Sequence, residues 1–152
     1  MARVLALDLG TKRIGVAVSD LTGVLASPLT TVARQGDRQA EHREIARLVT
    51  EEEAGEVLVG MPFNMDGSRG PAARAAEQEA EELRGVLSVP VHLVDERLTT
   101  VAADKVLLAR GQRAPQRRRI VDQTAAAVML QGWLDGRRTR DGRSGAGRDR
   151  VE

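Results

Sequence analysis

Short apolar runs dominate the N-terminal part of the chain. They occupy 3–9 (RVLALDL) and 13–19 (RIGVAVS), which a short glycine-containing connection separates. This pattern predicts two strands that form an antiparallel hairpin. A third strand is expected over about 24–32, where Pro28 indicates a sheet edge or a bulge.

From residue 37 onward, a helical spacing of apolar residues alternates with further short apolar runs. Ile45, Leu48 and Val49 fall on one side of the first such helix, and Pro71 suits the first position of the next. The expected elements are a helix over 37–54, a strand over 56–62, a helix from Pro71 to about Leu87, a strand over 89–96, a helix from Thr99 or Thr100 to Gly111 and a helix over 120–135. Together with the three leading strands, these elements predict an α/β fold. Its mixed five-stranded sheet has antiparallel first three strands and is flanked by about four helices.

The composition indicates one folded domain, expected over 1–136. An arginine-rich tail over 137–152 lacks periodicity and large apolar residues, which is typical of disorder. Because the chain contains no cysteine, disulfides and thiolate zinc sites are excluded and a cytoplasmic location is expected. No apolar run approaches the roughly 20 residues of a membrane span, so no membrane partner is expected.

Charge is unevenly distributed along the chain. Residues 1–109 carry 12 basic and 17 acidic side chains, whereas 110–152 carry 11 basic and 5 acidic ones, and every basic residue in the second part is arginine. Arginine-rich segments are typical of phosphate recognition, although a tail of this composition is also typical of a solubilising segment. The only aromatic residues of the Phe, Trp and Tyr classes are Phe63 and Trp133. A nucleic-acid partner is therefore expected to be held by its backbone and shape rather than by base stacking.

One carboxylate lies at the end of the first apolar run, just before the glycine turn. Since side chains alternate along a strand, Val4, Ala6 and Asp8 are expected on one face. A buried carboxylate is costly unless a cation or hydrogen-bond donors pair with it. Asp8 therefore predicts a nearby partner.

Two further acidic candidates lie at the ends of predicted elements. The strand over 89–96 ends in Asp95 and Glu96, which point to opposite faces, so a one-residue change of register would exchange them. Asp122 lies in the first turn of the last predicted helix. If the first and last strands are parallel and adjacent, Asp8 and Glu96 meet at one sheet edge, and Asp122 can close the group.

Convergent carboxylates repel one another unless a cation lies between them. Oxygen ligands of this kind favour Mg²⁺ or Mn²⁺, and two such ions about 3.5–4 Å apart can drive phosphodiester hydrolysis. Each carboxylate also has a structural interpretation. Asp8 can accept hydrogen bonds from the glycine turn, Asp122 can stabilise a helix N-terminus, and Glu96 can pair with Arg97.

Four segments resemble the YqgF/RuvX family of RNase H-like nucleases: ALDLGTKRIGVAVSD, VGMPFNMDGSRGP, VDERLTT and VDQTAAAVMLQGWL. The resemblance spans about residues 3–135 and implies an RNase H-like fold similar to that of RuvC-type Holliday-junction resolvases. It implies that Asp8, Glu96 and Asp122 form the catalytic, metal-binding site. Members are linked to 5′-end processing of pre-16S rRNA, and some to cleavage of four-way DNA junctions, which makes either nucleic acid an expected partner.

Several polar residues are candidates for contacts with the nucleic-acid backbone. They are Lys12 and Arg13 at the hairpin tip, Asn64, Ser68 and Arg69 in the loop FNMDGSRG, and Arg117, Arg118 and Arg119 before the last predicted helix. The hairpin residues can equally be a solvated turn. His42, His92 and Trp133 are expected to be structural, because neither histidine has metal-ligand spacing and the tryptophan ends a helix.

Two other function classes are compatible with parts of the sequence. The segment DLGTKRIGVAV also resembles the first phosphate loop of actin-like ATPases, but those proteins need a second phosphate motif and a second domain. A non-catalytic nucleic-acid or ribosome-precursor binding factor is the other alternative. A monomer and a homodimer are both compatible with the sequence, and a homodimer would suit a symmetric junction.

Overall fold

The computed structural model of the chain describes residues 2–62, 64, 66–96 and 125–137. Five strands and two complete helices follow one another in the order β1 (Arg3–Leu9), β2 (Arg13–Ser19), β3 (Ala26–Ala33), α1 (Arg38–Glu51), β4 (Ala54–Met61), α2 (Pro71–Val86) and β5 (Val91–Asp95). Residues 125–137 are also helical. The helix predicted to end at Gly111 lies outside the described residues.

The strands form one mixed sheet in the order β3-β2-β1-β4-β5. The first three strands are antiparallel, as predicted, whereas β4 is parallel to both β1 and β5. The condition named for a meeting of Asp8 and Glu96, that the first and last strands are adjacent, is not met, because β4 lies between them. The connection through α1 carries the chain from the edge strand β3 past β2 and β1, so β4 takes the place beside β1, and β5 then pairs with the outer edge of β4.

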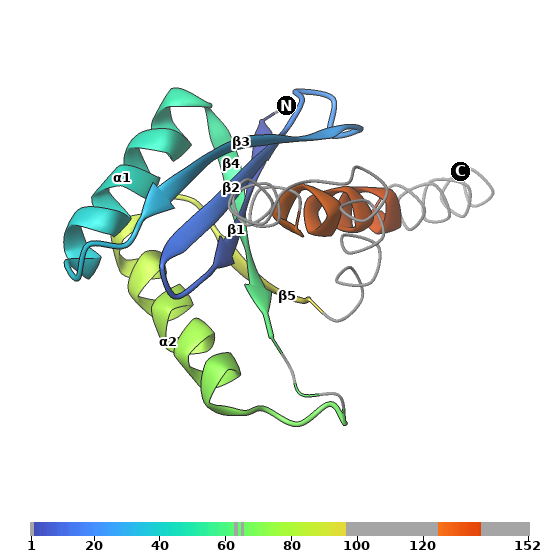
Figure 1. The fold of residues 1–152 in the computed structure, drawn as a ribbon. Coiled ribbons are helices and arrows are strands. Elements are labelled where there is room, and N and C mark those ends of the chain that lie inside the picture. Colours follow the sequence, from blue (N-terminus) through green and yellow to red (C-terminus); the bar gives the residue numbers. More distant parts are fainter. Residues whose placement is uncertain (1, 63, 65, 97–124, 138–152) are drawn as a thin grey trace, which may run out of the picture.

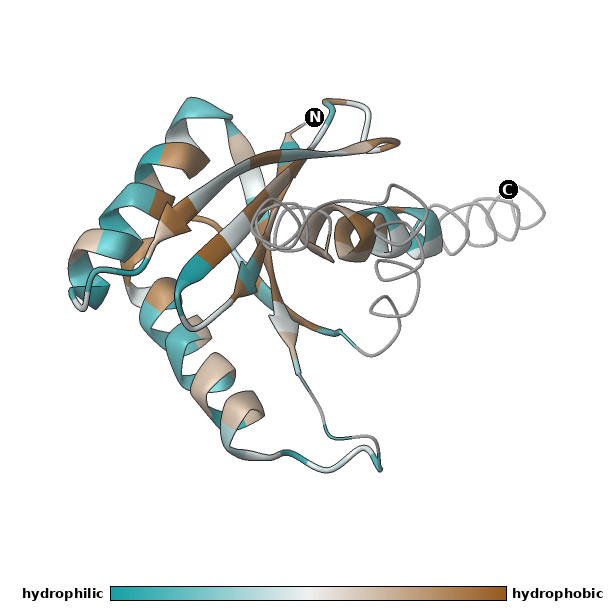
Figure 2. Ribbon diagram, viewed as in Figure 1, coloured by the Kyte–Doolittle hydropathy of each residue, from teal (hydrophilic) through white to brown (hydrophobic). Residues whose placement is uncertain are grey.

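The two faces of the sheet are covered by different helices (Figure 1). Leu5, Leu7 and Ile14 pack with α1 and α2 in the larger core. Val4 and Ala6 face the opposite side and pack against the helical residues 125–137. Figure 2 shows the apolar residues concentrated between these layers and the hydrophilic ones on the outer helix surfaces. The alternation predicted for β1 is therefore confirmed, and it places Asp8 on the side of 125–137.

The largest boundary error concerns the predicted helix over 37–54. Asp37 caps α1 by accepting a hydrogen bond from the Ala40 N–H, but the helix ends at Glu51. Glu53 has a φ of 54°, and β4 begins at the next residue. This end could not be read from the sequence, because glutamates favour helices and the left-handed residue that follows this helix is not the usual glycine.

Pro28 lies in β3, which is an edge strand, and the register shifts between Val16 and Ala17 opposite it. Both interpretations of this proline are thus confirmed. In the part of the chain that the structure describes, no helix has the length and apolar character needed to cross a membrane.

Candidate active site

The structure brings Asp8 and Glu96 together at the carboxyl ends of the parallel strands. Asp8 is the last but one residue of β1, and Glu96 directly follows β5, where its N–H donates to the Met61 carbonyl at 3.1 Å. The two carboxyl groups are hydrogen bonded to each other. The predicted meeting of Asp8 and Glu96 is thus present, although the two strands are not neighbours.

The contact crosses β4 at Gly60. Leu7 pairs with Val59, and Gly60 pairs with Val94, so Gly60 occupies the position of β4 between the two acidic ends. A Cβ placed on Gly60 would lie 2.6 Å from Glu96 Oε1. The Glu96 side chain therefore lies directly over the backbone of the intervening strand.

The pKa of Asp8 is unusually high for an aspartate. Burial, the hydrogen bond with Glu96 and the charge of Glu96 all raise the pKa of Asp8, from 3.8 to about 8. Protonated Asp8 can donate to Glu96, whereas two ionised carboxylates in this place would repel each other. The pair thus needs either a shared proton or a cation.

This donor set fits a hard divalent cation. Carboxylate oxygens from two strand ends are the ligands that Mg²⁺ and Mn²⁺ prefer, and a cation between the two groups would offset the burial and the repulsion from Glu96 that raise the pKa of Asp8. Within the described residues there is no group of three or more acidic, histidine or cysteine side chains that could hold a metal. Asp122, the third predicted ligand, lies outside those residues.

A family model described as RuvX: Holliday junction resolvase matches residues 2–136. The chain belongs to the RuvX family. A Myxococcus xanthus relative named "Putative pre-16S rRNA nuclease" is 48% identical over 139 residues, which cover 91% of each protein. A relative of the same name from Mycobacterium leprae (strain Br4923) is 50% identical over 135 residues, which cover 88% of this chain and 72% of the relative.

Among solved structures, the RuvX-family chain is similar to T. thermophilus RuvC in complex with a Holliday junction substrate. The TM-score is 0.57 at 19% identity, with 90% of this chain and 96% of the RuvC chain covered. At this identity the likeness concerns the fold alone, and together with the sheet order it confirms the predicted RNase H-like architecture.

The hairpin tip of this RuvX-family protein lies at the same end of β1 as Asp8. Lys12 is exposed and Arg13, at the start of β2, is half-buried. Arg34 stabilises this turn through two hydrogen bonds: its backbone N–H donates to the Lys12 carbonyl at 2.9 Å, and its Nε donates to the Gly10 carbonyl at 3.1 Å. A Cβ on Gly10 would lie 2.5 Å from the Arg13 carbonyl oxygen, so this tight turn requires glycine for space.

The polar loop after β4 is held by its own side chains. Asn64 Nδ2 donates to Ser68 Oγ at 3.0 Å, and Ser68 Oγ donates to Asp66 at 2.6 Å. Arg69 pairs with Glu77 of α2 at 2.6 Å. Asn64, Ser68 and Arg69 are all exposed, and the loop begins at the strand end next to Glu96. The remaining predicted contacts Arg117, Arg118 and Arg119, like Phe63, lie outside the described residues.

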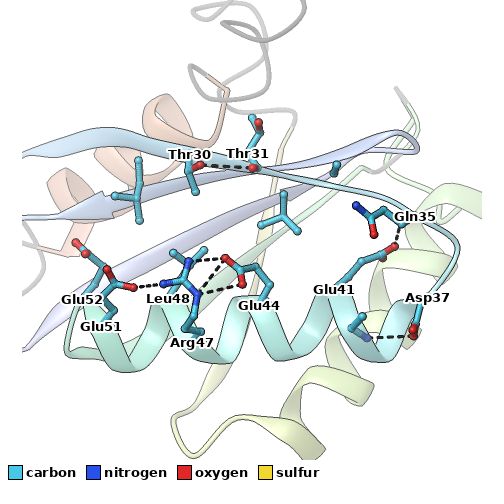
Figure 3. Close-up of a pocket in the computed structure, with 14 residues that line it drawn as sticks. Thr30, Thr31, Gln35, Asp37, Glu41, Glu44, Arg47, Leu48, Glu51 and Glu52 are labelled. Carbon is cyan, nitrogen blue, oxygen red and sulfur yellow. Dashed lines mark hydrogen bonds and ion pairs between the residues drawn. The ribbon is translucent and has the colours of Figure 1, made fainter.

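A cavity of about 540 Å³ lies elsewhere, between β3 and α1 (Figure 3). It faces the α1 and α2 side of the sheet, whereas Asp8 faces the other side. Several of its charged groups have partners within the wall: Arg47 pairs with Glu44 and Glu51, and Glu41 accepts from the Gln35 N–H at 2.8 Å. The cavity is therefore separate from the carboxylate pair.

The structure confirms structural roles for both histidines. His42 is buried and lies 2.8 Å from Glu79 Oε2. His92 stacks on Trp133 with ring centroids 6.5 Å apart and lies 3.2 Å from Glu56. Trp133 is only half-buried, packing against the core on one side and lying under Arg137 on the other.

Sequence reasoning missed Gly60 and Arg34. Gly60 follows Leu58 on one face of an otherwise large apolar run. An isolated glycine in a strand often marks a close approach, so the signal was present. Arg34 carried no such signal, because it lies outside every recognised motif and its main partner, Glu79, is 45 residues away in the sequence.

Proposed function

We propose that this RuvX-family protein is a divalent-metal-dependent endonuclease that hydrolyses phosphodiester bonds of nucleic acid. The observation that carries the proposal is the half-buried Asp8–Glu96 pair at the carboxyl ends of the parallel strands. Structural carboxylates normally pair with cationic side chains or backbone donors. Here the two carboxyl groups face each other, an arrangement that a divalent cation would stabilise.

Asp8 and Glu96 are the described residues that would hold Mg²⁺ or Mn²⁺, and we assign Asp122 as their third acidic partner on the family resemblance. When bound, the metal supplies Lewis-acid activation of water and stabilisation of the leaving oxygen. Asp8 and Glu96 must both be ionised to bind a cation, so the protein contributes two negative charges that balance the charge of the metal. The raised pKa of Asp8 means that metal binding at neutral pH displaces a proton.

The basic and polar groups around the site provide a route for substrate binding. We assign backbone contacts to Lys12 and Arg13 at the hairpin tip and to Asn64, Ser68 and Arg69 in the loop after β4, because both segments adjoin the strand ends that carry the pair. Arg117, Arg118 and Arg119 complete the proposed contacts. Phosphate recognition of this kind does not itself distinguish RNA from DNA.

The relatives indicate which substrates to test. The named relatives are called pre-16S rRNA nucleases, and the family model is described as a Holliday junction resolvase. We propose processing of the 5′ end of pre-16S rRNA, resolution of four-way DNA junctions, or both, in the cytoplasm and by a monomer or homodimer.

The deciding experiment incubates purified protein with end-labelled precursor rRNA and with a labelled four-way junction, each in Mg²⁺, Mn²⁺ or EDTA. Cleavage is expected with metal and not with EDTA. Asp8→Asn should bind the substrates and fail to cut them, because the amide cannot supply the negative charge that a cation requires. The uncharged Glu96→Gln variant should behave likewise.

The matched control is Asp20→Asn, which changes a half-buried turn aspartate to the same amide. It should cut like the unmodified protein. Binding of both substrates without cleavage under every metal condition would contradict the proposal and support a non-catalytic binding factor.

A further inference from the structure

We propose that Gly60 is a positioning residue, whose missing side chain opens the space through which Glu96 reaches Asp8. The part of this inference that concerns metal rests on the proposed function. The part that concerns the contact between the two carboxyl groups stands on geometry alone.

The sheet order makes such an opening necessary. Asp8 and Glu96 belong to the ends of strands that are separated by β4. Neighbouring strands in a sheet lie about 4.8 Å apart, so strands two positions apart are separated by about 10 Å. Two carboxyl groups can meet across that distance only if one side chain lies over the middle strand.

Glu96 is the side chain that does so. The outer atoms of the Glu96 side chain lie over β4, at the place where residue 60 has no side chain. A Cβ added to Gly60 would be 2.6 Å from Glu96 Oε1, 2.7 Å from its Cγ and 2.8 Å from its Cδ. Real Cβ atoms do not approach other atoms so closely, so any other residue at position 60 must displace Glu96. Since the backbone at Gly60 has no positive φ, the glycine is required for space and not for conformation.

Displacement of Glu96 should cost the fold little. The atoms that would collide are the far end of a flexible side chain, and this end can rotate away. The Asp8–Glu96 contact, in contrast, would be lost. A substitution at residue 60 is therefore expected to break the Asp8–Glu96 contact and to leave the stability of the fold nearly unchanged. If Gly60 had only a general packing role, the same substitution would lower the stability instead.

The test compares Gly60→Ala with Gly85→Ala, an alanine substitution in α2 where an added Cβ meets no atom within 4 Å. Mn²⁺ affinity is measured by calorimetry on the full chain, and melting is followed without metal. Gly60→Ala should weaken Mn²⁺ binding about tenfold or more, as loss of ligand orientation commonly does, with the melting temperature nearly unchanged. Gly85→Ala should bind Mn²⁺ like the unmodified protein.

A crystal structure of metal-free Gly60→Ala provides the readout that does not depend on metal. Glu96 should adopt a rotamer away from Asp8. Persistence of the contact, or unchanged Mn²⁺ affinity, would overturn the inference. If the unmodified protein binds no Mn²⁺, the proposed metal site fails, while the rotamer of Glu96 still decides the role of Gly60.

A second variant covers the case in which Gly60→Ala melts early. Adding Glu96→Ala removes the colliding atoms, so the double variant should regain its melting temperature. If it does not, the collision is with something other than Glu96, and the assignment of Gly60 is wrong.

Discussion

Asp8 carries a proton at a pH where an exposed aspartate has lost it, because burial and Glu96 raise its pKa to about 8. A raised carboxyl pKa in the folded state makes the protein more stable at low pH than at high pH. The folded state holds a proton that the unfolded chain releases at about pH 4, so the resulting stabilisation is complete below that pH. It is lost progressively as the pH rises through 8. The site thus reduces the stability of the metal-free protein at neutral and alkaline pH.

Asp8→Asn should therefore raise the melting temperature of the metal-free protein. The amide is neutral at every pH, so the gain should be small at pH 5 and grow toward pH 9. There we expect about 3 °C or more, since 1 kcal/mol corresponds to about 2–4 °C in a protein of this size. Calorimetric melting in EDTA across this pH range measures the difference. Added Mn²⁺ should stabilise the unmodified protein and leave Asp8→Asn unchanged.

Asp20→Asn is a control that should change the melting temperature in the opposite direction. The hydrogen bond from Thr22 and the backbone N–H donors of the turn lower the pKa of Asp20, so its ionised form favours the fold. Replacing it should lower the melting temperature at neutral pH. A destabilised Asp8→Asn would show that the Asp8 carboxylate is structural and would count against the proposed site.

At the scale of elements, one buried ionic cluster joins the hairpin turn to both helices of the larger core. Arg34 donates to Glu79 at 2.7 Å and 3.0 Å and to Glu41 at 3.1 Å. His42 shares Glu79, and Arg34 also holds the Gly10 carbonyl. The cluster thus fixes α1, α2 and the end of β3 to the turn that follows Asp8.

Replacing Glu79 with glutamine should destabilise the fold by about 3 kcal/mol, because it removes the carboxylate that bonds two nitrogens of a largely buried guanidinium and leaves Glu41, which bonds one nitrogen, as its charge partner. Burial alone raises the pKa of Glu79, but the hydrogen bonds from Arg34 and His42 outweigh it and the net pKa is lowered. The stabilisation is therefore present above the ordinary glutamate pKa and is lost as the pH falls below it. Urea unfolding at pH 7 and pH 3.5 should show a difference between the variants that shrinks in acid.

Glu82→Gln is the matched control on the same helix. Glu82 pairs with Arg38 of α1 at 2.7 Å, but both side chains are more than two-fifths exposed. Exposed pairs contribute about 0–1 kcal/mol. Equal losses in Glu79→Gln and Glu82→Gln would mean that the buried cluster has no special role.

The elements also show what the sequence could predict. The hairpin, the alternation along β1 and the edge position of Pro28 follow from local patterns, and all are present. The end of α1 could not be predicted, because it depends on a left-handed Glu53 in a run of good helix formers. The contact of Asp8 with Glu96 was expected for adjacent first and last strands. These strands are not adjacent, and the contact exists because Gly60 leaves room across β4. Long-range partners such as those of Arg34 have no local signature.

At the scale of the whole molecule, the sheet separates two kinds of surface. The side of α1 and α2 carries the cavity, in whose wall Arg47 pairs with Glu44 and Glu51. The other side carries Asp8 and the helical residues 125–137. Arg137, assigned from sequence to the tail, belongs to this helix, where it pairs with Glu56 at 2.5 Å and lies over Trp133. The strongly basic part of the sequence flanks this helix on both sides.

We expect this basic part to supply much of the affinity for nucleic acid, because phosphate contacts release counterions and make binding dependent on salt. Replacing both Arg117 and Arg118 with alanine should weaken binding to RNA and DNA of any sequence. The slope of log affinity against log salt should become shallower by about 1–2, since each lost phosphate contact removes about 0.7–0.9. Fluorescence anisotropy with labelled duplexes at several salt concentrations, in EDTA to prevent cleavage, measures both quantities.

Arg43→Ala with Arg47→Ala makes the same change in net charge on α1, on the opposite side of the sheet from Asp8. This control should leave the salt slope unchanged if binding is confined to the Asp8 side. Equal flattening in both double variants would show a response to total charge alone, and the assignment of Arg117 and Arg118 as phosphate contacts would fail. A change confined to Arg117 and Arg118 would instead place the bound backbone near the segment that leads into the helix on the Asp8 side of the sheet, where the proposed chemistry requires it.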